Sequence, residues 1–292
     1  MRLYPEAVRA LVDTALEEYF PAADTYPEIL YQSMRYSLLA GGKRFRPVLT
    51  ILAAGVFGAA PDSVLPCACG IEYIHTYSLI HDDLPAVDND DLRRGLPTNH
   101  KKFGEDIAIM AGDALFAEAF SLISRLQTAS DQRKIIEVIR EIAAASGPGG
   151  MVGGQVVDMA STGKPISLET LRFIHARKTG RLITAAARCG AILGGATDEE
   201  LDAVTSYGTH LGLAFQITDD ILDETGSVEE LGKTPGQDQT LHKATYPALV
   251  GLDESRRLAR AEAKAATAAV DKMSGNTGAL RDLAEFVTER TG

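Results

Sequence analysis

Residues 77–88 read YSLIHDDLPAVD, an apolar run that ends in three carboxylates. Asp88 follows Asp82 by six residues, so a straight helix would turn the two side chains apart. Pro85 cannot continue a helix and predicts a break that lets the chain bring Asp88 back towards Asp82. The stretch therefore predicts a helix end at which acidic side chains gather.

Residues 215–223, which read FQITDDILD, repeat this arrangement after a second apolar run. Asp219 and Asp223 are four residues apart and share one helix face, and Gln216 lies on the same stripe. Carboxylates crowded on one face repel each other and are costly to bury, so two such clusters point to a bound cation. Oxygen ligands suit a hard divalent ion, and Mg²⁺ is usually held by one or two carboxylates together with substrate phosphate oxygens.

A solvated surface and a calcium loop both explain the acidic residues less well than a magnesium site does. A solvated helix end is the ordinary meaning of one Asp-Asp pair, but it does not account for two pairs with matching apolar runs. A calcium loop that starts at Asp88 would need Gly at its sixth position and Glu at its twelfth, where the chain has Arg93 and Asn99.

The spacing of apolar residues predicts an all-α fold, because they recur three and four apart and no stretch sustains strand-like alternation. About ten or more helices should surround a central cavity, since several are too apolar all round to lie only on a surface. Thr197 and Glu200 form a capping box, Pro5 and Pro27 suit first helical positions, and Gly180 should kink a long helix. The expected helices cover residues 5–20, 27–40, 46–58, 63–83, 105–127, 131–145, 167–194, 197–224, 254–273 and 277–290.

Length and composition limit what the chain can be. Its 292 residues contain no low-complexity linker and no composition shift, so residues 1–292 are expected to form a single domain. The net charge of −11 argues against nucleic acid as a partner. Three cysteines indicate neither a disulfide framework nor a zinc ribbon. No uncharged run exceeds 16 residues, so we expect a cytoplasmic protein without a membrane span.

Basic residues cluster at two places where an anion would stabilise them. Residues 41–47, GGKRFRP, put three cations at the start of a helix, the end at which the helix dipole favours anions. This stretch is either a phosphate site that uses Lys43 and Arg46 or a solvated turn. Arg93 and Arg94 either grip a second diphosphate or neutralise the carboxylates beside them.

Three further features of the sequence are weak evidence for a functional site when each is taken alone. His75 and Ser78 share the helical stripe of Asp82, which sets His75 apart from an ordinary core histidine. Lys178 and Thr179 precede Gly180, and a kink there would aim both side chains inwards, although an exposed lysine beside a tolerated glycine is the commoner case. Lys233 stands in a loop and carries no signal of its own.

Taken together, the motifs resemble those of the short-chain trans-polyprenyl diphosphate synthases, and most of all those of the bacterial farnesyl diphosphate synthases. The likeness covers about residues 30–250, and the combination is far more specific than any single motif. The two acidic stretches are similar to the first and second aspartate-rich motifs of that family. The matching stretches, in family order, are residues 41–47, 74–95, 151–155, 175–180, 215–223 and 243–247.

The resemblance implies an isoprenoid-synthase fold, a homodimer, Mg²⁺, and head-to-tail condensation of isopentenyl diphosphate with dimethylallyl or geranyl diphosphate to (E,E)-farnesyl diphosphate. It assigns Mg²⁺ to Asp82, Asp88 and Asp219, supported directly or through water by Asp83, Asp220 and Asp223. It assigns the allylic diphosphate to Arg93, Lys178 and Lys233, and isopentenyl diphosphate to Lys43, Arg46, His75 and Arg94. Its catalytic residues are Lys178, Thr179 and Gln216, the last two facing or stabilising the carbocation.

Family position also identifies Tyr77 as the floor that sets product length, with Ser78 beside it, and an aromatic floor indicates a C15 product. Helical geometry favours Ser78, because Tyr77 lies about 140° round the helix from Asp82. Asn89 stands where many relatives carry Asp, and we expect little loss because the metal role belongs to Asp88.

Four alternatives differ from this interpretation. A C20 (geranylgeranyl) synthase differs only in product length. A class I terpene cyclase also uses paired acidic motifs but holds one diphosphate, whereas the basic residues predict two sites. A His-Asp phosphohydrolase would need a histidine set that the sequence does not offer. A non-catalytic binder would need damaged aspartates, and none of the six is missing.

Overall fold

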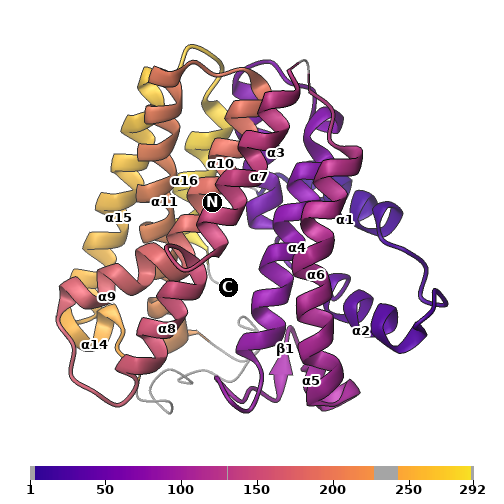
Figure 1. Ribbon diagram of the computed structural model, residues 1–292. Helices are drawn as coiled ribbons and strands as arrows, with labels where there is room; N and C mark the ends of the chain where they lie inside the picture. Colours follow the sequence, from indigo (N-terminus) through magenta and orange to yellow (C-terminus); the bar gives the residue numbers. More distant parts are fainter. Residues whose placement is uncertain (1–3, 130, 227–242, 291–292) are drawn as a thin grey trace.

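The two acidic stretches lie at the C-terminal ends of two long helices, α4 (Leu65–Asp82) and α11 (Asp198–Thr225). The computed structural model describes residues 4–129, 131–226 and 243–290, and Figure 1 shows how its helices are arranged. The other α-helices are α1 (Glu6–Tyr19), α2 (Glu28–Leu38), α3 (Phe45–Val56), α5 (Asn99–Phe103), α6 (Glu105–Leu126), α7 (Gln132–Ser146), α8 (Met151–Ser161), α9 (Leu168–His175), α10 (Arg181–Gly194), α14 (Tyr246–Val250), α15 (Leu252–Ala269) and α16 (Gly278–Glu289). Short turns of helix, η1 (Pro61–Val64), η2 (Ala176–Gly180) and η3 (Val270–Lys272), and a hairpin of β1 (Leu92–Arg93) and β2 (Leu96–Pro97) complete the described elements.

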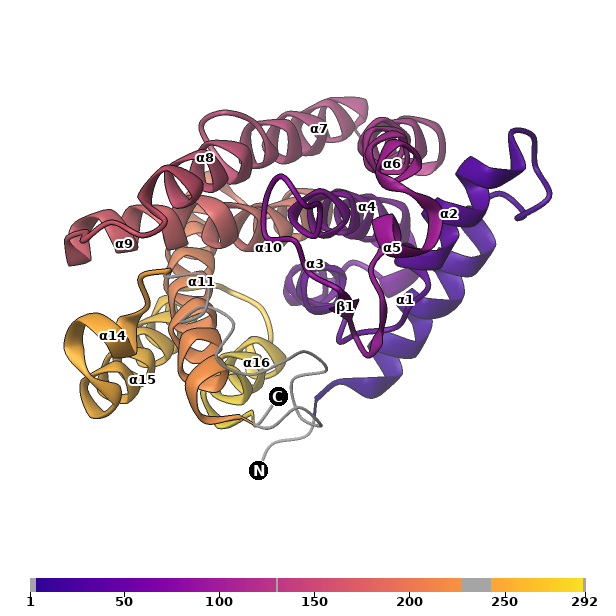
Figure 2. The same cartoon turned by 90° about the horizontal axis from the view of Figure 1, so that it is seen from below.

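Helices α3, α4 and α10 lie inside the bundle, and the other long helices surround them (Figure 2). α10 packs against α3, α7 and α11, and α4 packs against α3 and α6. One large cluster of buried apolar side chains joins these helices, and a smaller cluster links α9, α11, α14 and α15. The all-α expectation is confirmed, because within the described residues only the two-residue strands of the hairpin pair as a sheet.

Helix ends follow the signals in the sequence. The capping box is confirmed: the backbone N–H of Glu200 donates to Thr197 Oγ1 (3.3 Å), and the backbone N–H of Thr197 donates to Glu200 Oε2 (2.9 Å). Pro5 and Pro27 stand one residue before α1 and α2, not at the first helical position. Both prolines still mark a helix start, since neither has an N–H that the first turn would need.

Several short or glycine-containing elements differ from the expected helices. Gly153 and Gly154 weaken the helix preference of α8, yet tertiary packing favours glycine there. A Cβ added to Gly154 would lie 2.3 Å from the backbone N of Lys178 in η2, so the glycine lets α8 press directly on that segment. The expected kink at Gly180 is a π turn over Ala176–Gly180, which separates α9 from α10. α5 and α14 have five residues each, too few for a periodic signal.

α6 is the one helix among the described residues that is long and apolar enough to cross a membrane, judged by length and composition. In its most apolar stretch 39% of the residues are buried, and the helix packs against α2, α4 and α5. A core helix of a bundle passes the same test, so the finding is weak evidence for a span.

Two glycine substitutions test how closely the central helices pack. A Cβ on Gly190 of α10 would lie 2.1 Å from the carbonyl O of Thr50 in α3, whereas a Cβ on Gly55 meets no atom within 4 Å. We expect Gly190→Ala to lower the free energy of unfolding by about 1–3 kcal/mol through overpacking. Gly55→Ala, on an exposed helix face, should raise it by up to about 1 kcal/mol. Urea denaturation measures both, and equal stabilities for the two variants would contradict the packing.

Candidate active site

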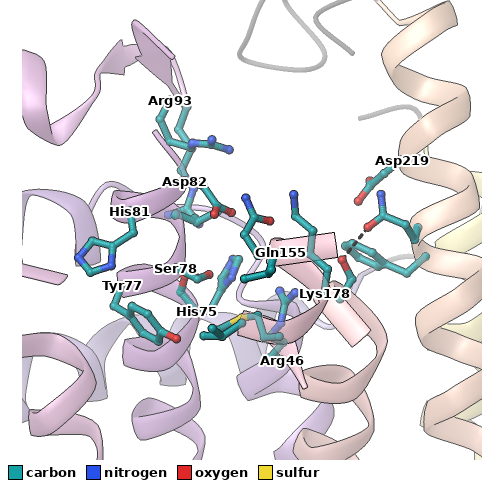
Figure 3. A pocket seen from close by; sticks show the side chains of 18 of the residues that line it. Arg46, His75, Tyr77, Ser78, His81, Asp82, Arg93, Gln155, Lys178 and Asp219 are labelled. Atoms are coloured by element: carbon teal, nitrogen blue, oxygen red, sulfur yellow. Dashed lines mark hydrogen bonds between the residues drawn. The ribbon is translucent and has the colours of Figure 1, made fainter. Parts of the chain in front are cut away.

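The ends of α4 and α11 open onto one cavity of about 470 Å³. Its walls come from α3, α4, β1, α8, η2 and α11, and Figure 3 shows the side chains that point into it. Most of the residues singled out in the sequence line this cavity: Arg46, His75, Tyr77, Ser78, Asp82, Arg93, Arg94, Lys178, Thr179, Gln216 and Asp219. Asp83, Asp88, Asp220, Asp223 and Lys43 do not line it, and Lys233 lies outside the described residues.

The chain turns back after α4 as Pro85 predicts. The backbone N–H of Asp88 donates to the carbonyl O of Asp82 (2.9 Å), which returns Asp88 to the helix end. Asn89 then adopts φ = 52°, a left-handed conformation that Asn tolerates better than most residues. Asp88 Oδ1 accepts a hydrogen bond from Lys243 Nζ (2.8 Å). Asp88 therefore lies near Asp82, and its carboxylate is paired with Lys243, which belongs to a distant segment of the chain.

Asp82 and Asp83 have different surroundings despite being adjacent. Burial raises the pKa of Asp82, and the nearby charge of Lys178 opposes that rise. Asp83 points away from the cavity, where its carboxylate accepts hydrogen bonds from Arg93. Burial raises the pKa of Asp83 to about 6 in spite of Arg93. Arg93 also pairs with Asp90 at 3.2 Å, so neutralisation of neighbouring carboxylates, the simpler of its two interpretations, applies in part.

The second cluster is divided in the same way. Only Asp219 reaches the cavity, and Arg290, from the residue after α16, donates a hydrogen bond to its Oδ1. Asp220 is buried and accepts hydrogen bonds from Gln216 Nε2 (3.1 Å) and from the backbone N–H of Tyr246 (2.9 Å). Asp223 is also buried. The structure therefore places Asp220 as an anchor between α11 and α14.

Lys178 and Thr179 point into the cavity from the π turn, as the expected kink predicted. Lys178 Nζ donates to Asp158 Oδ2 (2.7 Å), an α8 residue that no sequence motif singled out. Burial lowers the pKa of Lys178, but Asp82 and Asp158 outweigh burial and raise it above its ordinary value. Thr179 Oγ1 donates to Gln216 Oε1 (2.7 Å), so hydroxyl, amide and the Asp220 carboxylate form one hydrogen-bonded chain.

Among the described residues, the carboxylates near the basic residues on the α3 side do not outweigh the effect of burial. Arg46 is buried, and its Nε has no hydrogen-bond partner among the described residues. Arg94 donates to the carbonyl O of Gly41 and packs over Gly42, where a Cβ would lie 2.7 Å from Arg94 Cζ. Burial lowers the pKa of Arg46 and of Arg94, and burial with the surrounding arginines lowers that of His75 well below its ordinary value. An anion bound in this half of the cavity would favour the charged forms of these three side chains.

Arg44 belongs to the same basic stretch, residues 41–47, but it does not line the cavity. It adopts φ = 53° and turns away from the cavity, where it pairs with Asp13 (2.8 Å) and with buried Glu72 (2.9 Å). Lys43 stays near the cavity. Burial lowers its pKa, Arg290 lowers it further, and Asp219 raises it.

Lys243 and Arg290 are the charged residues that sequence reasoning missed at the carboxylates. Lys243 belongs to a matching motif, but nothing in its spacing shows that it reaches Asp88, 155 positions earlier. Arg290 belongs to no motif. It stacks over Phe215 (4.1 Å to the ring centroid) and donates to the carbonyl O of Phe215 (3.1 Å) as well as to Asp219.

A family model described as polyprenyl synthetase matches residues 27–282. The chain belongs to this family. It is 47% identical over 280 residues to the chloroplastic geranylgeranyl pyrophosphate synthase of Catharanthus roseus, which covers 96% of this chain and 74% of that one. It is 45% identical over 280 residues to the farnesyl diphosphate synthase of Geobacillus stearothermophilus, which covers 96% of this chain and 94% of that one.

Solved structures give the same result. A geranyltransferase of Helicobacter pylori, complexed with magnesium and isoprenyl diphosphate, has a TM-score of 0.86 at 32% identity and covers 97% of this chain and 95% of that one. The expected isoprenoid-synthase fold is therefore confirmed, and the protein is a short-chain prenyltransferase. The names of the relatives include both C15 and C20 synthases, and one is chloroplastic, so product length and the cytoplasmic location stay predictions.

Proposed function

We propose that the protein condenses isopentenyl diphosphate head-to-tail with dimethylallyl or geranyl diphosphate and releases (E,E)-farnesyl diphosphate. The observation that supports this best is the charge division of the cavity. One half holds Asp82, Asp219 and Lys178, and the other holds Arg46, Arg94 and His75, for which burial outweighs the nearby carboxylates of the described residues and lowers the pKa. An enzyme that joins two diphosphates needs two such different anion sites, whereas a terpene cyclase needs one.

Mg²⁺ fits the acidic half together with a diphosphate. Among the described residues, no three acidic, histidine or cysteine side chains converge closely enough to hold an ion unaided. Asp82, Asp88 and Asp219 still supply hard oxygen donors, and Mg²⁺ commonly takes one or two carboxylates and completes its shell with phosphate oxygens and water. When bound there, Mg²⁺ would neutralise charge on the departing diphosphate.

The residues of the chain supply the remaining steps. Lys178 and Arg93, with Lys233 and Lys243 as further candidates, hold the allylic diphosphate while its C1–O bond breaks, and their charge stabilises the leaving oxygen. Thr179 and Gln216 line the cavity and present polar oxygens to the allylic cation, which requires that water be kept away from it. Lys43, Arg46, His75 and Arg94 orient isopentenyl diphosphate so that its alkene attacks the cation. The proton then lost passes to the released diphosphate.

A C20 product is the second candidate, because a relative at 47% identity is a geranylgeranyl pyrophosphate synthase. The cavity supports C15 instead. Tyr77 lines the cavity and is buried, and burial raises the pKa of the phenol to about 12, so the ring stays neutral. Behind Tyr77 stand two more rings, Phe116 at 5.0 Å and Phe120 at 5.3 Å from Phe116.

Turnover of the purified protein tests the function. With Mg²⁺, isopentenyl diphosphate and geranyl diphosphate we expect a C15 diphosphate, identified by chromatography after dephosphorylation. Asp82→Ala should lower kcat by at least about 100-fold, because the residue acts on charge that develops in the transition state. Asp62→Ala, a change in the short helix η1 far from the cavity, is the control and should keep full activity. Full activity of Asp82→Ala would contradict the proposed metal role.

Product analysis of Tyr77→Ala tests the floor. Removing the phenol should let the chain extend until it meets Phe116, so the main product should lengthen from C15 to C20. Phe116→Ala alone should still give C15, because Tyr77 would still close the cavity. An unchanged product from Tyr77→Ala would refute the floor assignment.

We also propose a homodimer that forms through α6, α7 and α8, which follow one another along one side of the bundle (Figure 2). Large apolar side chains are exposed on all three helices, including Met110 (52%), Ile136 (60%) and Met159 (45%). Such a patch on a protein surface marks an interaction site.

Light scattering after gel filtration tests the dimer. We expect the wild type at about twice the chain mass of 31.2 kDa. Met110→Glu should shift the protein to the monomer, because a charge on an apolar contact must be desolvated. Leu249→Glu, equally apolar but on α14, should leave the dimer intact. A wild type that elutes as a monomer would contradict the proposal.

A further inference from the structure

Gln155 of α8 is one of the residues that line the cavity, and the hydrogen-bonding capacity of its amide group is unused among the described residues. Its Oε1 and Nε2 each expose less than 1 Å², and neither has a hydrogen-bond partner among the described residues. Such burial is unfavourable, because the amide loses water and gains no partner in return. Most buried polar groups in proteins are satisfied, so an unsatisfied amide at a ligand cavity points to a partner that arrives with the ligand.

The other buried glutamine amides show what a satisfied group looks like. Gln127 Nε2 donates to the carbonyl oxygens of Ser63 (2.7 Å) and Thr128 (2.7 Å), and its Oε1 accepts from the backbone N–H of Cys67 (3.0 Å). Gln216 likewise uses both ends of its amide. Gln155 is therefore not a glutamine that holds the fold together.

The surrounding backbone fixes where Gln155 points. Figure 3 shows its side chain directed into the space between Asp82 and Lys178. On the next turn of α8, Asp158 holds Lys178 Nζ at 2.7 Å, and the absent side chain of Gly154 brings α8 against the backbone of Lys178. Two contacts thus lock α8 to the π turn, and the amide is held in place without hydrogen bonds of its own.

We propose that Gln155 is a catalytic residue that contacts the allylic substrate at the bond that breaks, with its N–H donating to the diphosphate and its Oε1 facing the carbon. This inference rests on the proposed function. The C1–O bond breaks heterolytically, both electrons leave with the diphosphate oxygen, and the carbon becomes cationic. No proton passes to or from Gln155.

An amide suits this position better than any charged group. Negative charge develops on the diphosphate as positive charge develops on the carbon, and one amide offers a donor to the first and an acceptor to the second. Because both of its ends are free among the described residues, neither orientation has to break an existing hydrogen bond. An amide oxygen is also a poor nucleophile, so it does not trap the cation.

Gln155→Met tests the inference, because it keeps the length of the side chain and removes both polar atoms. We expect kcat with geranyl diphosphate and isopentenyl diphosphate to fall at least 10-fold, with a smaller change in the KM for isopentenyl diphosphate. The melting temperature of the ligand-free variant should equal or exceed that of the wild type, because an unsatisfied buried amide is removed. Mg²⁺ with inorganic diphosphate should raise the melting temperature of the variant less than that of the wild type.

Gln127→Met is the matched control. It removes an amide that holds the fold, so it should lower the melting temperature and leave kcat and both KM values unchanged. Kinetic constants of Gln155→Met within twofold of the wild type, or a loss of melting temperature like that of Gln127→Met, would overturn the inference. Absence of condensation by the wild type would instead contradict the proposed function, and the inference with it.

Discussion

Keeping negative charge at the buried end of α4 is the constraint on which the rest of the site depends. Burial raises the pKa of Asp82, and a protonated carboxyl could not hold a cation. The charge of Lys178 opposes that effect, and Lys178 is itself held by Asp158 at 2.7 Å. The ionisation of a residue on α4 thus depends on a lysine from the π turn and on an aspartate from α8.

Asp88 and Asp219 are also paired with cations, and the C-terminal part of the chain supplies both. Lys243 pairs with Asp88 at 2.8 Å, and the backbone N–H of Tyr246 donates to Asp220 at 2.9 Å, so residues 243–246 connect both acidic clusters. Arg290 neutralises Asp219. Asp88 and Asp219 are therefore each paired with a cation from the C-terminal part of the chain.

The sequence predicted those parts of the molecule whose signals are local. The capping box of Thr197 and Glu200 fixes where α11 begins, and the break at Pro85 returns Asp88 to the end of α4. α8 was not predicted, because Gly153 and Gly154 both disfavour a helix. Packing of α8 against η2 nevertheless requires a residue without a side chain at position 154. The roles of Arg290 and Asp158 were not predicted, because the spacing of residues along the sequence does not reveal an ion pair between distant segments. The spacing also did not separate Asp219, which lines the cavity, from Asp223, which is buried elsewhere, because i, i+4 counting shows a shared face but not the neighbour that the face meets.

The cation-rich half of the cavity bears on how many diphosphates the site would hold, which the acidic half alone does not indicate. Carboxylates and cations that neutralise each other around Asp82 are compatible with any enzyme that ionises a single diphosphate. Arg46, Arg94 and His75 have no such role, because burial lowers all three pKa values and thus disfavours their charged forms. Burying the Arg46 and Arg94 guanidinium groups carries an energetic penalty that the nearby carboxylate of Glu72 offsets only in part, and a bound anion would lower that penalty further. A second diphosphate is the component that the proposed condensation would bring to this half of the cavity.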